Sequence, residues 1–139
     1  MDLFKVKKSV SDSLREYRSD LDFKYELDDD DSLVIKNEHL KMCGDGVSLF
    51  CTIKAIGEVR FVAIFDELEL NINTAKLMNK IQERSIFQTL INSKGYLCFK
   101  VIGYTANENE VGPLFTLYLS YLSNLSALEE MKEITKLTN

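Results

Sequence analysis

The spacing of apolar residues near the start of the chain predicts a helix. Apolar side chains recur every three or four positions between residues 3 and 21, which is the spacing of one helix face. These positions are Leu3, Val6, Val10, Leu14, Tyr17 and Leu21. We therefore expect a first helix over about residues 5–19, and Ser9 or Ser11 would cap a shorter version.

After residue 21 the pattern changes to one typical of strands. Residues 22–26 alternate only weakly, whereas residues 32–37 form a short run rich in β-branched side chains. Residues 47–56 and 59–68 carry β-branched and aromatic side chains on both sides of the turn Gly57-Glu58. This is the clearest hairpin in the chain, and it brings the number of strands predicted in the first half to three.

The second half predicts a helix, a hairpin and a long final helix. Residues 73–85 have helical spacing, with Asn73 or Thr74 as the N-cap. Residues 86–91 and 96–104 form two strands around a turn that contains Gly95. Residues 113–136 have helical spacing throughout, and Pro113 suits the first position of a helix.

This order predicts a single α+β domain over residues 1–139 with a five-stranded antiparallel sheet. The elements would follow as helix, three strands, helix, two strands and long helix. A chain of 139 residues is of ordinary size for one domain and can bury a core without disulfides or metals.

Composition restricts the partners and the compartment. A net charge of -5 argues against general nucleic-acid binding and would suit a basic partner, although Lys5, Lys7 and Lys8 form a small basic group. No run of 18 apolar residues occurs, and no apolar run follows the first charges, so we expect neither a membrane span nor a secretory signal. Three cysteines without a CxxC motif favour free thiols in a reducing cytoplasm.

Four consecutive aspartates, at positions 28–31, suggest a cation site at first sight. An EF-hand loop that started at Asp28 would need Gly at its sixth position and Glu at its twelfth. Those positions hold Leu33 and His39. We therefore interpret the aspartates as a solvated turn before a strand, because Asp favours turns.

His39 and the cysteines do not form a recognisable metal or catalytic set. His39 and Cys43 are four positions apart, but the glycines after Cys43 favour a loop. Zinc needs about four ligands, and Cys51 and Cys98 sit in apolar runs typical of core cysteines. The motifs for nucleotide phosphates, zinc proteases and serine hydrolases are absent. We therefore expect no cofactor, no metal and no enzyme activity, and the reactivity of Cys43 stays open.

The strand over residues 59–65 is apolar on both faces. One face carries Val59, Phe61, Ala63 and Phe65, and the other carries Arg60, Val62, Ile64 and Asp66. A strand buried on both sides has this pattern. Loops of the same chain, a second subunit or a client protein could each cover the second face, or the strand could simply be a central one under well-placed helices.

The final helix is apolar over more than the usual stripe. Its first half carries Leu114, Leu117, Tyr118, Tyr121, Leu122 and Leu125. Such a helix is either central in the fold or part of an oligomer interface, where Tyr is a favoured residue.

Three segments carry a resemblance to a known family. These are GVSLFCTIKAIGEVRFVAIFDEL, NTAKLMNKIQERSIFQTLINSKGYLCFKVIGY and the leucine-rich ending. They resemble the central hairpin, the helix with two strands and the closing helix of the type III secretion chaperone-like fold, most closely its YbjN-like family. The resemblance implies a small, acidic, usually dimeric protein without catalytic residues that binds partners through apolar surface.

Our leading hypothesis is thus a cytoplasmic, homodimeric protein-binding module, chaperone-like or regulatory. We assign Phe61, Ala63 and Phe65 to the partner surface. The dimer interface would use Leu117, Tyr118 and Tyr121. A second hypothesis, based on net charge, is an immunity or inhibitor protein that neutralises a basic toxin or enzyme. A third is a small enzyme with an unrecognised site.

Overall fold

The computed structural model describes residues 1–28, 31–42 and 45–138, with the side chains of Met42 and Asp45 left out. Within these residues the chain forms one antiparallel sheet and four α-helices, which confirms the α+β class. The prediction of five strands is wrong, because the sheet has six. The elements follow as α1 (Leu3–Tyr17), β1 (Lys24–Asp28), β2 (Ser32–Met42), β3 (Asp45–Lys54), β4 (Glu58–Glu67), α2 (Ile72–Glu83), β5 (Gln88–Ile91), β6 (Tyr96–Tyr104), α3 (Glu108–Asn124), the 3-10 turn η1 (Leu125–Ala127) and α4 (Glu129–Thr135).

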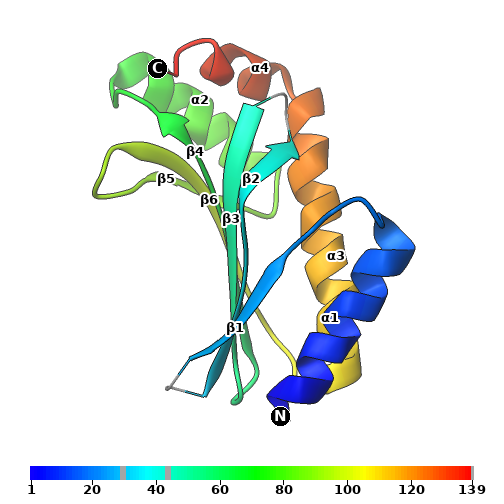
Figure 1. Cartoon of the computed structure of the whole chain (residues 1–139). Helices are drawn as coiled ribbons and strands as arrows, with labels where there is room; N and C mark the ends of the chain where they lie inside the picture. The colour runs from blue at the N-terminus through cyan, green and yellow to red at the C-terminus, as the bar shows by residue number, and fades with distance from the viewer. Residues whose placement is uncertain (29–30, 43–44, 139) are drawn as a thin grey trace.

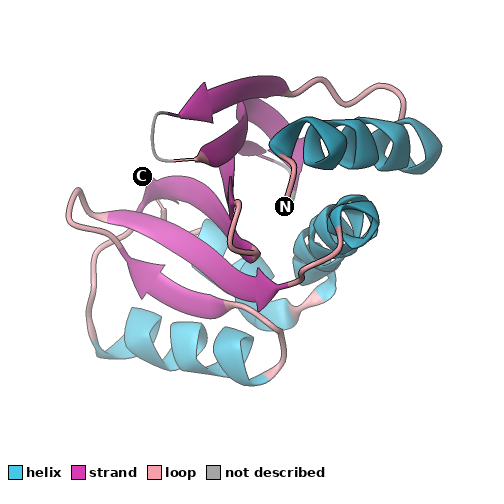
Figure 2. Ribbon diagram, turned by 90° about the horizontal axis from the view of Figure 1, so that it is seen from below, coloured by secondary structure: helices cyan, strands magenta, loops and turns pink. Residues whose placement is uncertain are grey.

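The helices lie on one face of a strongly twisted sheet. The strands lie in the order β1-β2-β3-β4-β6-β5, and all neighbours are antiparallel. Helices α1 and α3 pack side by side against this face, and α2 lies near β5 and β6 (Figures 1 and 2). In Figure 2 the opposite face opens to the left and carries no helix.

Strand β1 is the element that the sequence pattern did not predict. It is an edge strand that pairs only with β2, and four of its five residues are exposed. An edge strand with little buried surface needs no strict alternation of apolar and polar residues. Strand β2 also runs further than predicted, since a bulge between Asn37 and Leu40 interrupts the alternation and hides its second half.

The final helix differs from the prediction at its start and in its middle. Helix α3 begins at Glu108, and the Asn107 side chain caps it by accepting the N–H of Asn109 at 2.9 Å. Pro113 therefore lies inside the helix and does not open it. The chain then turns through η1, so α4 is a separate short helix that packs against α2. The nearly buried Glu130 carboxylate fixes this contact through an ion pair with Arg84 at 2.9 Å.

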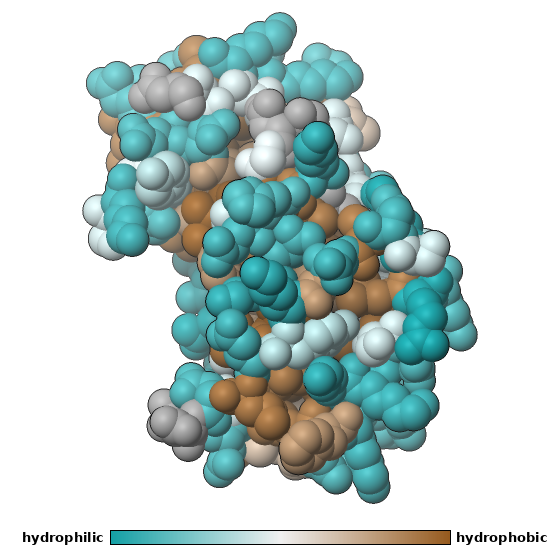
Figure 3. Space-filling view, in the orientation of Figure 1, coloured by the Kyte–Doolittle hydropathy of each residue, from teal (hydrophilic) through white to brown (hydrophobic). Residues whose placement is uncertain are grey.

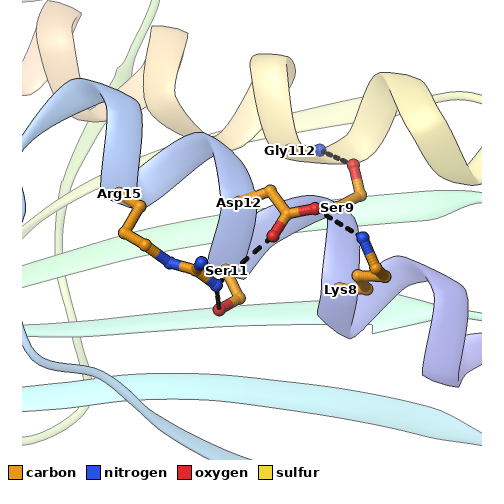
Figure 4. Close-up of polar contacts among 6 residues, drawn as sticks. All are labelled: Lys8, Ser9, Ser11, Asp12, Arg15 and Gly112. Carbon is orange, nitrogen blue, oxygen red and sulfur yellow. Dashed lines mark hydrogen bonds and ion pairs between the residues drawn. The ribbon is translucent and has the colours of Figure 1, made fainter.

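Caps place the other two helices slightly earlier than predicted. The Asp2 carboxylate accepts the N–H of Phe4 at 2.9 Å and caps α1. Asn71 caps α2 and exchanges hydrogen bonds with Thr74, a reciprocal arrangement that satisfies two N–H groups. Neither predicted serine caps a helix, and Ser9 points towards α3 instead (Figure 4).

The contact between α1 and α3 depends on a glycine. The N–H of Gly112 donates to Ser9 Oγ at 3.0 Å, across the two helices (Figure 4). A Cβ atom added to Gly112 would overlap the carbonyl oxygen of Ser9 and the Oγ of Ser13. The two helix backbones approach this closely only because residue 112 has no side chain.

The core between sheet and helices is built around aromatic rings. Phe61, in the central strand β4, has its ring 5.8 Å from Phe115 and 5.6 Å from Tyr118, both of α3. Its other side faces Phe87, at 6.2 Å between ring centroids. Such edge-on and tilted pairs add specific geometry to the burial of the rings.

Candidate interaction surface

Strand β4 divides its side chains between the two faces of the sheet. Val59, Phe61 and Ala63 are fully buried under the helices, and Phe65 is 6% exposed. A partner protein cannot contact Phe61 or Ala63 in this fold. The predicted partner surface of Phe61, Ala63 and Phe65 is therefore wrong, because these side chains lie on the face that the chain's own helices cover. The two faces look alike in the sequence, and the structure separates them.

The opposite face of the sheet has no helix over it. Residues paired across neighbouring strands point to the same side, so the register identifies which side chains share this face. We call it the open face and define its apolar part by six residues. They are Val34 of β2, Phe50 of β3, Val62 and Ile64 of β4, and Ile102 and Tyr104 of β6.

These side chains are accessible to a partner. Val62 and Ile64 in the central strand are half-buried, whereas their neighbours Phe61 and Ala63 are fully buried. Ile102 is 37% exposed and Tyr104 is 74% exposed. Hydrophobic side chains reach the surface in the middle of the molecule in Figure 3 and also at its lower end, where the N-terminus lies.

Two hollows lie at the ends of the open face. One, of about 460 Å³, is lined by Ser48, Phe50, Ile64 and the turn between β5 and β6. The other, of about 550 Å³, is lined by Asp28, Thr52 and the turn between β3 and β4. The open face is therefore not flat, and a partner's side chains can insert into the two hollows.

Charged side chains surround the apolar residues. Lys36 Nζ lies 2.9 Å from Glu26 Oε1, and the hydrogen bond that Lys36 donates to that carboxylate raises the pKa of Lys36. Glu58 accepts from both Lys54 and Arg60, each at 3.3 Å. Desolvation acts to raise the pKa of Glu58, but the hydrogen bond from Lys54 and the attraction of both cations lower it overall. Glu58 therefore stays ionised at neutral pH, and each of the two carboxylates lies close enough to its cations to neutralise them in part.

The three residues predicted for a dimer interface separate into two groups. Tyr118 is buried, with its ring on Phe61, and its hydroxyl occupies the space that a Cβ atom on Gly103 would fill. Tyr118 is thus a core residue, and the assignment to an interface is wrong for it. Leu117 is 44% exposed and Tyr121 is 40% exposed, so both remain accessible on α3.

Tyr121 lines a hollow of about 460 Å³ between α2 and the end of α3. Arg84 and Ile86 form its wall on the α2 side, and Leu125 and Leu128 form the wall beyond α3. The lining of the hollow is therefore mixed, with apolar side chains beside the charged Glu83 and Arg84.

We predict that Tyr121→Glu raises the dissociation constant of a homodimer at least ten-fold, because it places a charge in an apolar contact. The measurement is the mass in solution by light scattering after size exclusion, over a range of concentrations. Tyr104→Glu, the same change on the open face, serves as the control and leaves this equilibrium unchanged. A monomeric wild type, or a Tyr121→Glu variant that unfolds, would contradict the assignment.

The other candidate residues from the sequence are dispersed over the fold, and Cys98, which pairs with Ile64 across the sheet, lies on the side of the open face. Burial raises the pKa of the Cys51 thiol far above its usual range, which makes it unreactive. Burial also raises the pKa of Cys98, and its Sγ donates to the carbonyl oxygen of Tyr96 at 3.5 Å. His39 is exposed, and Cys43 lies outside the described residues. Among the described residues, no group of three or more His, Cys, Asp and Glu side chains could hold a metal ion.

The aspartates fall at the turn between β1 and β2. Asp28 is the last residue of β1 and Asp31 occupies the turn with φ +53°, a backbone conformation that Asp tolerates better than most residues. The carbonyl oxygen of Asp31 accepts the N–H of Ala55 at 3.1 Å. Residues 29 and 30 lie outside the described part of the chain. The predicted turn is thus confirmed for the residues that the structure describes.

Comparisons with protein-family models, with curated proteins and with solved structures found no match for this chain. No helix in the described part of the chain is both long enough and apolar enough to cross a membrane.

The sequence pattern contained a signal for the open face that the assignment overlooked. Phe61 and Phe65 are the largest side chains of β4 and mark the core face. The other face combines small β-branched residues with Arg60 and Asp66 at its ends. Charged side chains are costly to bury, so the face of a strand that carries charges at its ends is the one expected to contact water.

Proposed function

We propose that this chain is a non-enzymatic protein-binding module, chaperone-like or regulatory, that holds its partner on the open face. The observation that supports the proposal is the half-buried apolar surface of Phe50, Val62 and Ile64 on a sheet face without a helix. Exposed apolar patches rimmed by polar groups are typical of protein-interaction sites. Burial of this surface against a partner would supply the affinity.

The homodimer and the compartment belong to the same proposal. Self-association through Leu117 and Tyr121 on α3 would leave the open face free, because α3 lies on the opposite side of the sheet. A cytoplasmic location suits the buried thiols of Cys51 and Cys98. The resemblance to YbjN-like and secretion chaperones agrees with both.

We predict that Ile64→Thr weakens partner binding about ten-fold, since it removes apolar contact area but keeps a β-branched side chain in the strand. The probe is reduced and alkylated α-lactalbumin, a permanently unfolded protein with exposed apolar segments. Binding is measured by fluorescence anisotropy of the labelled probe, and thermal unfolding of each variant checks that the fold is intact.

Ile72→Thr is the matched control, because Ile72 is 78% exposed on α2, away from the open face. It should bind the probe as the wild type does. No binding by the wild-type protein would contradict the chaperone-like proposal. If wild type and Ile64→Thr bind the probe with equal affinity, the partner binds a surface other than the open face.

A further inference from the structure

One row of the open face crosses all six strands without a carboxylate. The register aligns these residues from edge to edge of the sheet. In strand order they are Lys24, Lys36, Phe50, Val62, Lys100 and Gln88. The row therefore presents two apolar side chains in the centre with a lysine on each side of them.

The rows beside the lysine row are close to neutral. On one side, the row of Ser48, Ile64, Cys98 and Leu90 carries no charge. On the other side lies the row of Glu26, Val34, Thr52, Arg60 and Ile102, with one charge of each sign, and beyond it the row of Asp28, Ser32, Lys54, Glu58 and Tyr104, with two carboxylates and one lysine. The lysine row is thus a local concentration of positive charge in a chain of net charge -5.

Lys100 is the cation most available to a partner in the centre of the sheet. The carboxylates of Glu26 and Glu58 are already engaged with Lys36, Lys54 and Arg60. No carboxylate of the described residues lies within ion-pair distance of Lys100. Lys100 pairs across the sheet with Val62, so it is a direct neighbour of the apolar residues in the register of the sheet.

We propose that the partner contributes an acidic segment in which Asp or Glu residues flank apolar ones. This inference rests on the proposed function and adds the chemistry of the partner. Lys36 and Lys100 are three strand spacings apart, or about 14 Å, which corresponds to about four residues of extended chain. The segment would therefore carry carboxylates about four positions apart, with apolar residues between them for Phe50 and Val62.

The composition of the face favours a protein over a nucleic acid. Four of its six apolar residues are aliphatic, and only Phe50 and Tyr104 could stack on bases. The local charge also opposes the basic partner that the net charge alone suggests.

The test is a selection of displayed random 16-residue peptides on the full-length protein. We expect the enriched peptides to be acidic, with carboxylates separated by apolar residues. An enriched peptide, labelled and titrated, should bind Lys100→Glu about ten-fold more weakly than wild type and should lose affinity as salt rises. Lys76→Glu on the exposed side of α2 makes the same charge change and should have no effect.

The outcomes separate this inference from the proposed function. Peptides that need Ile64 but carry no acidic excess, or that bind Lys100→Glu like wild type, overturn the inference and leave the proposed function standing. Peptides that bind Ile64→Thr and wild type equally, or no enrichment at all, overturn both. A poly(U) RNA oligonucleotide is titrated in parallel. If the protein binds this RNA more tightly than any peptide, and if Lys100→Glu abolishes that binding, the open face is a nucleic-acid site and the inference is overturned.

Discussion

Replacing Phe61 with alanine is expected to lower the free energy of unfolding by about 4 kcal/mol. Phe61 is fully buried in the central strand, and its ring contacts Phe87, Phe115 and Tyr118. Removal of the ring leaves a cavity that these neighbours cannot fill by small movements. Urea unfolding followed by circular dichroism measures the change, provided that the slope of the transition stays constant.

Phe50→Ala is the matched control for this prediction. Phe50 also lies in a central strand but is only half-buried, on the open face. Its replacement should cost about half as much and should weaken binding of the unfolded probe. If Phe61→Ala costs no more than Phe50→Ala, the two faces have been assigned the wrong way round.

Gly112→Ala is expected to lower the free energy of unfolding by about 2 kcal/mol. Alanine favours a helix by about 1 kcal/mol over glycine, so helix propensity alone predicts stabilisation. Here the added Cβ would overlap the carbonyl oxygen of Ser9, which is backbone and cannot rotate away. Helices α1 and α3 must then separate, and overpacking of this kind costs up to about 3 kcal/mol. Thermal and urea unfolding both measure the net effect.

Gly46→Ala provides a comparison, since nothing lies within 4 Å of a Cβ added at that position. It should change stability by less than about 0.5 kcal/mol. A Gly112→Ala variant as stable as the wild type, or more stable, would show that helix propensity outweighs the close contact and that the two helices can adjust.

Local patterns in the sequence predicted the elements in which one face is regularly apolar and buried. The hairpin of β3 and β4 and the first helix follow directly from spacing, because their apolar residues meet the core at regular intervals. Strand β1 could not be predicted in this way, since an edge strand with four exposed residues has little pattern to show. The bulge in β2 shifts the alternation of apolar and polar residues, so the second half of the strand does not continue the pattern of the first half.

The break between α3 and α4 has a similar explanation. Leu122, Leu125 and Met131 are all buried, so the apolar spacing continues through a turn that changes the direction of the chain. The start of α3 was misplaced because Pro113 is tolerated inside this helix, near its beginning, where few backbone hydrogen bonds are lost.

The candidate surface required the structure because it depends on which face the helices cover. Alternation in β4 divides the side chains correctly into two sets, but it does not say which set is inside. Long-range contacts decide this, through Phe115 and Tyr118 on a helix more than 50 residues away. The lysine row is likewise invisible in sequence, because its members come from separate strands and meet only through the register.

Methyl-resolved NMR of isoleucine-labelled protein tests most directly whether partners bind the open face. The protein is titrated with the unfolded, alkylated α-lactalbumin probe. We predict that the signals of Ile64 and Ile102 shift or broaden saturably, while those of buried Ile53 and of exposed Ile72 on α2 stay unchanged. Changes confined to Ile72 or to Ile86, with Ile64 and Ile102 unaffected, would contradict the account.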